Sequence, residues 1–175
     1  MSTYTQRLAH YGLTDDQYTR AVAAHELAHG LTAAARPTTT SHGVEIHTRG
    51  RDGTRGLART GAAPGHTIDP FDRAVICEVG AIAKEYWLRN VERVWSSQLA
   101  YLVRETAAGD RANIRGLGLT SRQQDEALRE AERTVRALWP ALTAGVPKLV
   151  AKKQLTGSQV VKLQSGRRGF LGIFS

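Results

Sequence analysis

The stretch Val-Ala-Ala-His-Glu-Leu-Ala-His-Gly-Leu at residues 22–31 decides how the first part of the chain folds. It lies in an alanine-rich run, and its apolar residues and both histidines recur at three- and four-residue steps, the period of one helix face. Upstream, Thr14 and Gln17 have the spacing of a capping box, and downstream Pro37 cannot continue a helix. We therefore predict a helix over Asp15–Ala35 whose two histidines point inward.

Within this stretch, His25, Glu26 and His29 form the pattern His-Glu-x-x-His. Histidines four residues apart stack on one face of a helix, so both imidazoles can converge on one metal ion at Zn–N distances of about 2.0–2.1 Å. Glu26 is rotated by roughly 100° from His25, which leaves it able to reach a water at the metal. A helix can carry this pattern by chance, but burying two unpaired histidines would be costly without a ligand. The pattern predicts one zinc ion (Zn2+) per chain, with Glu26 as the general base of peptide hydrolysis.

A zinc site of this kind needs a third protein ligand. The long extension that supplies a third histidine in metzincins is absent, because Thr32 and Ala35 occupy the positions that would require glycine and histidine. A carboxylate is then the expected ligand. Spacing alone does not select one among six candidates, which are Glu45, Glu78, Glu85, Asp69, Asp72 and Asp110.

The rest of the chain predicts one hairpin and several more helices. Residues 44–48 alternate in polarity, a turn rich in Gly, Arg and Asp follows, and residues 56–60 return as a second strand. Two further helices are predicted from Asp69-Pro70 to about Asn90 and over residues 91–105. A third begins at a Ser121 and Gln124 capping box and runs toward Trp139. Gly145 and Pro147 interrupt the apolar pattern that follows, and a last short helix begins at Thr156. Asp110 then lies near a helix start. We expect a mostly α-helical fold with one small sheet.

The composition is that of a globular protein. The 175 residues are 41% hydrophobic and 23% charged, so we expect one domain over residues 1–164 that buries a core. For residues 165–175 we expect a flexible tail of basic and apolar residues. Cys77 is the single cysteine, so a disulfide framework is excluded and a reducing, cytoplasmic location is favoured. The N-terminus lacks a signal-peptide pattern, and no stretch reaches the roughly 20 apolar residues of a membrane span. We therefore expect no transmembrane segment.

The net charge of +8 raises the question of an anionic partner. The arginines are scattered over predicted helix exteriors and the loop at residues 49–59, without interleaved aromatic residues or a recognisable nucleic-acid module. We therefore expect solvated helix faces and no specific nucleic-acid partner. Salt-sensitive binding of nucleic acid or anionic lipid through the charge and residues 167–171 is the alternative.

Residues 22–31 resemble the metal helix of the FtsH-type peptidase domain, the proteolytic half of the membrane-anchored AAA proteases. Later segments agree in order. Residues 44–56 are similar to that family's strand, Arg-Gly-Arg turn and second strand, residues 75–85 to its Gly-Gly-Arg-x-Ala-Glu-Glu helix, and residues 106–110 to its Thr-Gly-Ala-Ser-Asn-Asp turn. The resemblance spans residues 18–163 and departs from the family's usual residues at Ala28, Ala81 and Gly109.

This resemblance implies a zincin-like helical metallopeptidase domain. It implies Asp110 as the third zinc ligand beside His25 and His29, and it places Glu85 next to the metal site. It also implies that an extended substrate binds along the second strand, at Gly56, Leu57, Ala58 and Arg59.

The resulting functional expectation is a zinc-dependent metalloendopeptidase that hydrolyses peptides or unfolded proteins. The 175 residues contain no Walker motif, so unfolding of a substrate would need an AAA ATPase in trans. An oligomer stays open as an expectation, although the connection between Asp110 and the helix at Ser121 is much shorter than in the family, where a longer insertion helps to build a ring-shaped oligomer. The alternative is a non-catalytic or partner-dependent adaptor that binds an ATPase or a protease through a metal-stabilised, peptidase-like fold.

Overall fold

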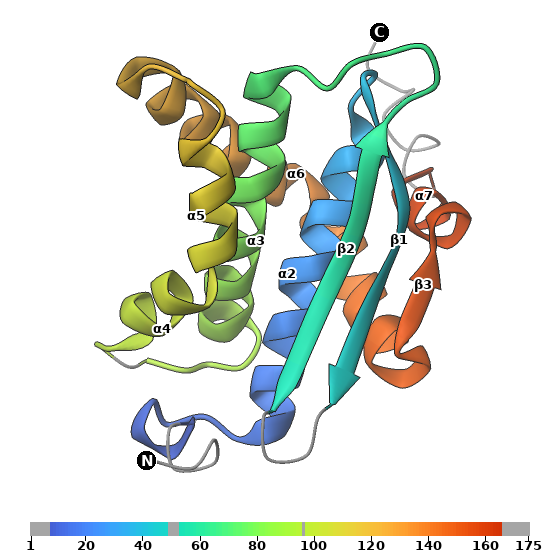
Figure 1. Ribbon diagram of the computed structural model, residues 1–175. Coiled ribbons are helices and arrows are strands. Elements are labelled where there is room, and N and C mark those ends of the chain that lie inside the picture. Colours follow the sequence, from blue (N-terminus) through green and yellow to red (C-terminus); the bar gives the residue numbers. More distant parts are fainter. Residues whose placement is uncertain (1–7, 49–52, 96, 166–175) are drawn as a thin grey trace, which may run out of the picture.

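The computed structural model describes residues 8–48, 53–95 and 97–165. Its elements in chain order are α2 (Asp15–Ala35), β1 (Thr39–Thr48), β2 (Thr54–Ala62), α3 (Pro70–Asn90), α4 (Leu99–Thr106), α5 (Ala108–Arg115), α6 (Ser121–Lys152), β3 (Gln154–Thr156) and α7 (Gly157–Ser165) (Figure 1). The predicted fold class, mostly α-helical with one small sheet, is confirmed. The predicted Arg-Gly-Arg turn at residues 49–51 and the predicted tail, apart from Ser165, lie outside the described residues.

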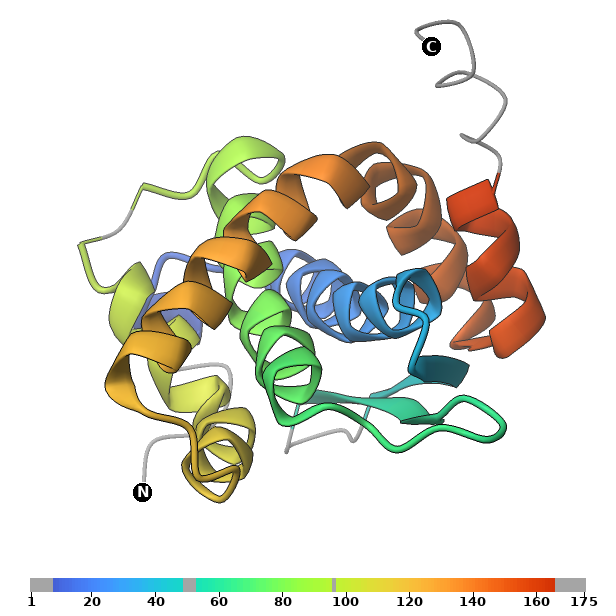
Figure 2. The same ribbon diagram turned by 90° about the horizontal axis from the view of Figure 1, so that it is seen from above.

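Helix α2 is the central helix and has the predicted bounds. The Thr14 hydroxyl accepts a hydrogen bond from the Gln17 backbone N–H at 3.2 Å, and Gln17 Oε1 accepts one from the Thr14 N–H at 2.9 Å. This is the predicted capping box. The helix ends where Arg36 becomes extended, as a residue before proline prefers. Figure 2 shows α2 enclosed by α3, α6 and the strands, so most of its side chains are buried.

Helix α3 packs antiparallel against α2. Its N-cap is Asp69, as predicted, whose carboxylate accepts hydrogen bonds from two backbone N–H groups of the first turn at 2.7 and 3.3 Å. Arg36, just after the end of α2, forms an ion pair with Asp72 near the start of α3. At the other end of the pair, the ammonium group of Lys84 lies 4.4 Å from the centre of the Tyr18 ring. The middle of α3 therefore faces the histidine-bearing turns of α2.

The sheet has the strand order β2-β1-β3, with both pairs antiparallel. The predicted hairpin is present and is longer than predicted, with Leu57 opposite Glu45 and Gly56 opposite Ile46. Strand β3 was not predicted, because three residues are too few to show an alternating pattern. Among the described strands, β2 pairs only with β1, so its outer edge is not covered by another strand.

The connection between α3 and α4 differs from the prediction. A helix was expected over residues 91–105, but α4 begins only at Leu99. The backbone of Arg93 has a φ of 57°, in the left-handed region, which a continuing right-handed helix cannot contain. The described part of residues 91–98 therefore forms the connection between α3 and α4.

Helix α6 is one helix of 32 residues where an interruption was expected. Its N-cap is Thr120, which forms the capping box with Gln123; the prediction was one residue too late because two overlapping Ser/Thr-x-x-Gln patterns occur there. Pro140 and Pro147 lie within the helix on its exposed side, where a carbonyl that loses its helical partner can be hydrated. Figure 2 shows α6 curving around the core.

Candidate metal centre

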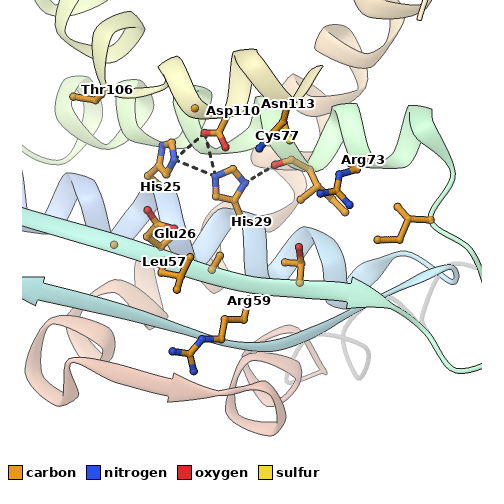
Figure 3. A pocket seen from close by; sticks show the side chains of 16 residues that line it. His25, Glu26, His29, Leu57, Arg59, Arg73, Cys77, Thr106, Asp110 and Asn113 are labelled. Atoms are coloured by element: carbon orange, nitrogen blue, oxygen red, sulfur yellow. Dashed lines mark hydrogen bonds and ion pairs between the residues drawn. The ribbon is translucent and has the colours of Figure 1, made fainter. Parts of the chain in front are cut away.

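Three side chains from distant parts of the chain meet between α2 and α5. The Nε2 atoms of His25 and His29 are 3.0 Å apart. Asp110, in the first turn of α5, places Oδ2 at 3.1 Å from His25 Nε2 and 3.5 Å from His29 Nε2 (Figure 3). The structure thus brings together the two histidines of the pattern and one of the six candidate carboxylates.

The geometry of this cluster fits one tetrahedral metal ion. Ligand atoms bound at about 2.0–2.2 Å with tetrahedral angles are separated by roughly 3.3–3.5 Å. The separations of 3.0, 3.1 and 3.5 Å are close to this value. Two imidazole lone pairs and a carboxylate directed at one another also repel unless a proton or a cation lies between them. The three residues are therefore a set of donors that could hold one metal ion.

The tautomer of His29 suits metal binding. Its Nδ1–H donates a hydrogen bond to the carbonyl oxygen of Ile76 in α3, at 2.5 Å, so Nε2 is the nitrogen directed at the cluster. Nε2 donates to Asp110 when it is protonated and offers a lone pair to a cation when it is not. Only 7% of the His29 surface is exposed. Such an outer hydrogen bond fixes the ring orientation before a metal arrives.

The charges of the cluster support the same assignment. Burial would raise the pKa of Asp110, but hydrogen bonds and charge interactions with the two histidines hold that pKa well below its usual range. Burial lowers the pKa of His25. Burial also acts to lower the pKa of His29, but the Asp110 carboxylate, Glu26 and the Ile76 carbonyl together raise it. Asp110 is therefore ionised near neutral pH and would supply a negative charge to a cation held there.

Glycine 80 of α3 makes room for the two imidazoles. A Cβ atom at this position would lie 2.5 Å from His29 Nε2 and 2.7 Å from His25 Cε1. Both distances are far below ordinary van der Waals contact. Gly80 belongs to the segment that resembles the family helix, but its steric role could not be derived from the sequence alone.

The predicted base and substrate strand line a cavity of about 580 Å³ above the cluster. Glu26 points toward β2 (Figure 3), and it lies so close to Gly56 that a Cβ there would be 2.2 Å from Glu26 Cγ. Leu57, Ala58 and Arg59 also line the cavity, and Arg59 is held by an ion pair to Glu45 at 2.7 Å. The cavity thus has the outer edge of β2 on one side and the cluster on the other.

The structure corrects the expected place of Glu85. Its carboxylate pairs with Arg89 at 2.8 Å, and it lines a separate cavity between α3 and α6. On a helix, the residue four positions after Gly80 shares its face, whereas the residue five positions after it is rotated away. The face of α3 toward the cluster, where Glu85 was expected, is therefore occupied by Lys84.

The remaining candidate carboxylates lie outside the cluster. Asp69 caps α3, Asp72 pairs with Arg36, and Glu45 pairs with Arg59. Glu78 does not line the cavity above the cluster, and burial raises its pKa. Asp110 is the one member of the six that reaches the two histidines.

Sequence reasoning missed Lys84. Only 2% of this residue is exposed, and its ammonium group donates a hydrogen bond to Thr106 Oγ1 at 3.0 Å. Burial lowers its pKa to about 7, although the nearby negative charge of Glu26 acts to raise it. The signal in the sequence was its helical spacing from Gly80, which places it on the face toward α2.

A scan against models of protein families finds no match, and a comparison with curated proteins finds none either. None of the helices in the described parts of the chain has the length and apolar character to cross a membrane.

Proposed function

We propose that this protein is a zinc-dependent endopeptidase, with His25, His29 and Asp110 as the metal ligands and Glu26 as the general base. The observation that carries the proposal is the convergence of three ligand atoms within 3.5 Å of one another, next to a glutamate in the same cavity. A zinc ion held there would polarise a water molecule and the carbonyl group of a peptide bond. A zincin-like, FtsH-type peptidase domain is the family that this proposal favours.

Glu26 supplies the proton transfers. Its carboxylate takes a proton from the attacking water as the new C–O bond forms, and it returns that proton to the amine nitrogen as the C–N bond breaks. The Glu26 side chain is confined on one side by Gly56, whose missing side chain leaves room for the carboxylate. This contact keeps the base beside the position of the scissile bond rather than in bulk solvent.

The outer edge of β2 favours an extended substrate. Residues 56–60 line the cavity, and the only described strand paired with β2 lies on its other side. A peptide can therefore add to this edge through backbone hydrogen bonds, with its scissile bond over the cluster. A folded protein does not present such a segment, so we propose peptides or unfolded proteins as substrates, with delivery of folded ones by an AAA ATPase in trans.

The test of this function combines metal content with hydrolysis. Protein purified without added metal is expected to contain one zinc per chain, and to cleave a dye-labelled unfolded protein. Cleavage should be lost after removal of the metal by a chelator and restored by zinc. Absence of metal would refute the proposal, whereas bound zinc with no cleavage of any unfolded substrate would favour the adaptor function instead.

Replacing Gly80 by alanine is expected to weaken zinc binding by at least roughly 10- to 100-fold, the effect typical of disturbed ligand orientation. The added methyl group would overlap the imidazoles of His25 and His29. Competition with a chromogenic chelator measures the affinity. Gly109→Ala is the matched control, since a Cβ there meets no atom within 4 Å although the residue precedes Asp110. Equal affinities in the two variants would contradict the steric role of Gly80.

A further inference from the structure

The cavity above the cluster extends beyond the three ligand residues toward the start of α3. At that end its walls include Thr60 of β2, Ile68 and Arg73 of α3. Figure 3 shows Arg73 at one end of the site. Strand β2 runs from Gly56, which lies against Glu26, to this end of the cavity. An extended substrate on the outer edge of β2 would therefore pass Arg73 on one side of the scissile bond.

Helical spacing turns Arg73 toward the cavity. Arg73, Ile76, Cys77 and Gly80 lie three or four residues apart and share one face of α3. The first three line the cavity, and Gly80 lies against the imidazoles. Burial raises the pKa of the Cys77 thiol to about 11, with a further contribution from Asp110, and the positive charge of Arg73 acts to lower it. The guanidinium of Arg73 is therefore near the cavity wall.

Arg73 has no anionic partner among the described residues. The acidic residues closest to it in sequence are occupied, because Asp69 caps α3 and Asp72 pairs with Arg36. Under the proposed function, a zinc ion would offset the two negative charges at the cluster, those of the base and of the carboxylate ligand. An exposed arginine is ordinarily hydrated, and a carboxylate is the group that best replaces that water, through two parallel hydrogen bonds.

We propose that Arg73 forms a subsite for an acidic side chain of the substrate, roughly two to four residues from the scissile bond. The inference rests on the proposed peptidase function and specifies its substrates as peptides with Asp or Glu on one side of the bond. Arg73 lies seven residues before Gly80, about 10 Å along α3 at about 1.5 Å per residue. An extended peptide advances about 3.3 Å per residue, so about three residues cover this distance.

Peptide pairs that differ only in charge test this subsite. A quenched fluorescent peptide is prepared with Glu or Gln at each position up to about four residues from the cleaved bond, on both sides. A third version carries Lys at the position with the largest effect. The kcat/KM of each peptide is measured with the wild-type protein, Arg73→Gln, Arg73→Glu and the control Arg129→Gln, which changes an exposed arginine of α6. Zinc content and melting temperature of every variant are measured in parallel.

The wild-type protein is expected to prefer Glu over Gln by roughly 5- to 50-fold on one side of the bond, between the effects of an exposed ion pair and of a buried charged hydrogen bond. Arg73→Gln should abolish this preference, and Arg129→Gln should retain it. Arg73→Glu should transfer the preference to the Lys peptide, which a merely structural role of Arg73 would not do. A preference on the N-terminal side of the bond indicates a peptide antiparallel to β2, and one on the C-terminal side a parallel peptide.

Two results would overturn the subsite. One is equal cleavage of the Glu and Gln peptides by the wild-type protein at all positions, which leaves the peptidase function intact. The other is an unchanged preference for Glu in both Arg73 variants, which would assign the preference to another group. Failure to cleave any peptide would instead refute the proposed function, and the subsite with it.

Discussion

Replacing Glu26 by glutamine is expected to lower kcat for peptide hydrolysis by roughly 10²- to 10⁴-fold, the contribution typical of a general base. Glutamine has nearly the same shape as glutamate, so it fits against Gly56, but its amide cannot accept the proton of the attacking water. His25, His29 and Asp110 are unchanged in this variant. Zinc content is therefore expected to equal that of the wild-type protein.

The measurement is steady-state hydrolysis together with metal analysis of the same samples. Glu85→Gln is the matched control, because it makes the same chemical change in a residue that pairs with Arg89 and lines a different cavity. The control should retain wild-type activity. Substantial activity in Glu26→Gln would remove Glu26 from the mechanism, and lost activity in Glu85→Gln would restore the role that the sequence assigned to it.

Replacing Asp110 by asparagine is expected to weaken zinc binding by more than the roughly 10- to 100-fold that follows loss of an outer hydrogen bond. The substitution removes the carboxylate ligand. It also removes the negative charge of a carboxyl group that the two histidines keep ionised. Hydrolysis should fall with the zinc content and recover in part at high zinc concentration. Asp125→Asn, on the exposed face of α6, is the control for loss of one negative charge.

Chelator competition measures the zinc affinity of Asp110→Asn, and the melting temperature of the metal-free variant shows whether its fold is also affected. If Asp110→Asn binds zinc as tightly as the wild-type protein, another group completes the metal site and the assignment of Asp110 is wrong. If zinc binding is lost but the melting temperature of the metal-free protein also falls strongly, the ion pairs of Asp110 contribute to folding as well.

The sequence predicted the elements whose signals are local. The bounds of α2 follow from the Thr14 and Gln17 box and from Pro37, and the start of α3 follows from Asp69. The convergence of His25 and His29 follows from helical spacing alone. These interactions join residues a few positions apart, so no knowledge of tertiary structure is needed.

Features that depend on tertiary packing were not predicted. Strand β3 forms only because Leu155 lies opposite Val44, far away in the chain. Glu85 was assigned from the family resemblance, but Gly80 is the residue of α3 that lies against the imidazoles of α2. Lys84, four positions after Gly80, shares the face toward α2, and Glu85 does not. Spacing likewise left six carboxylates open, and only the packing of α5 selects Asp110.

The position of Asp110 on α5 has a consequence for the folding of the whole chain. Helices α4 and α5 pack chiefly against α3, whereas the two histidines belong to α2. An ion bound by all three residues would link segments that are distant in sequence, and because the site exists only in the folded chain, its binding free energy would stabilise the folded state. Under the proposed function, zinc supply would then govern how much of the protein escapes degradation in the cell as well as how fast it works.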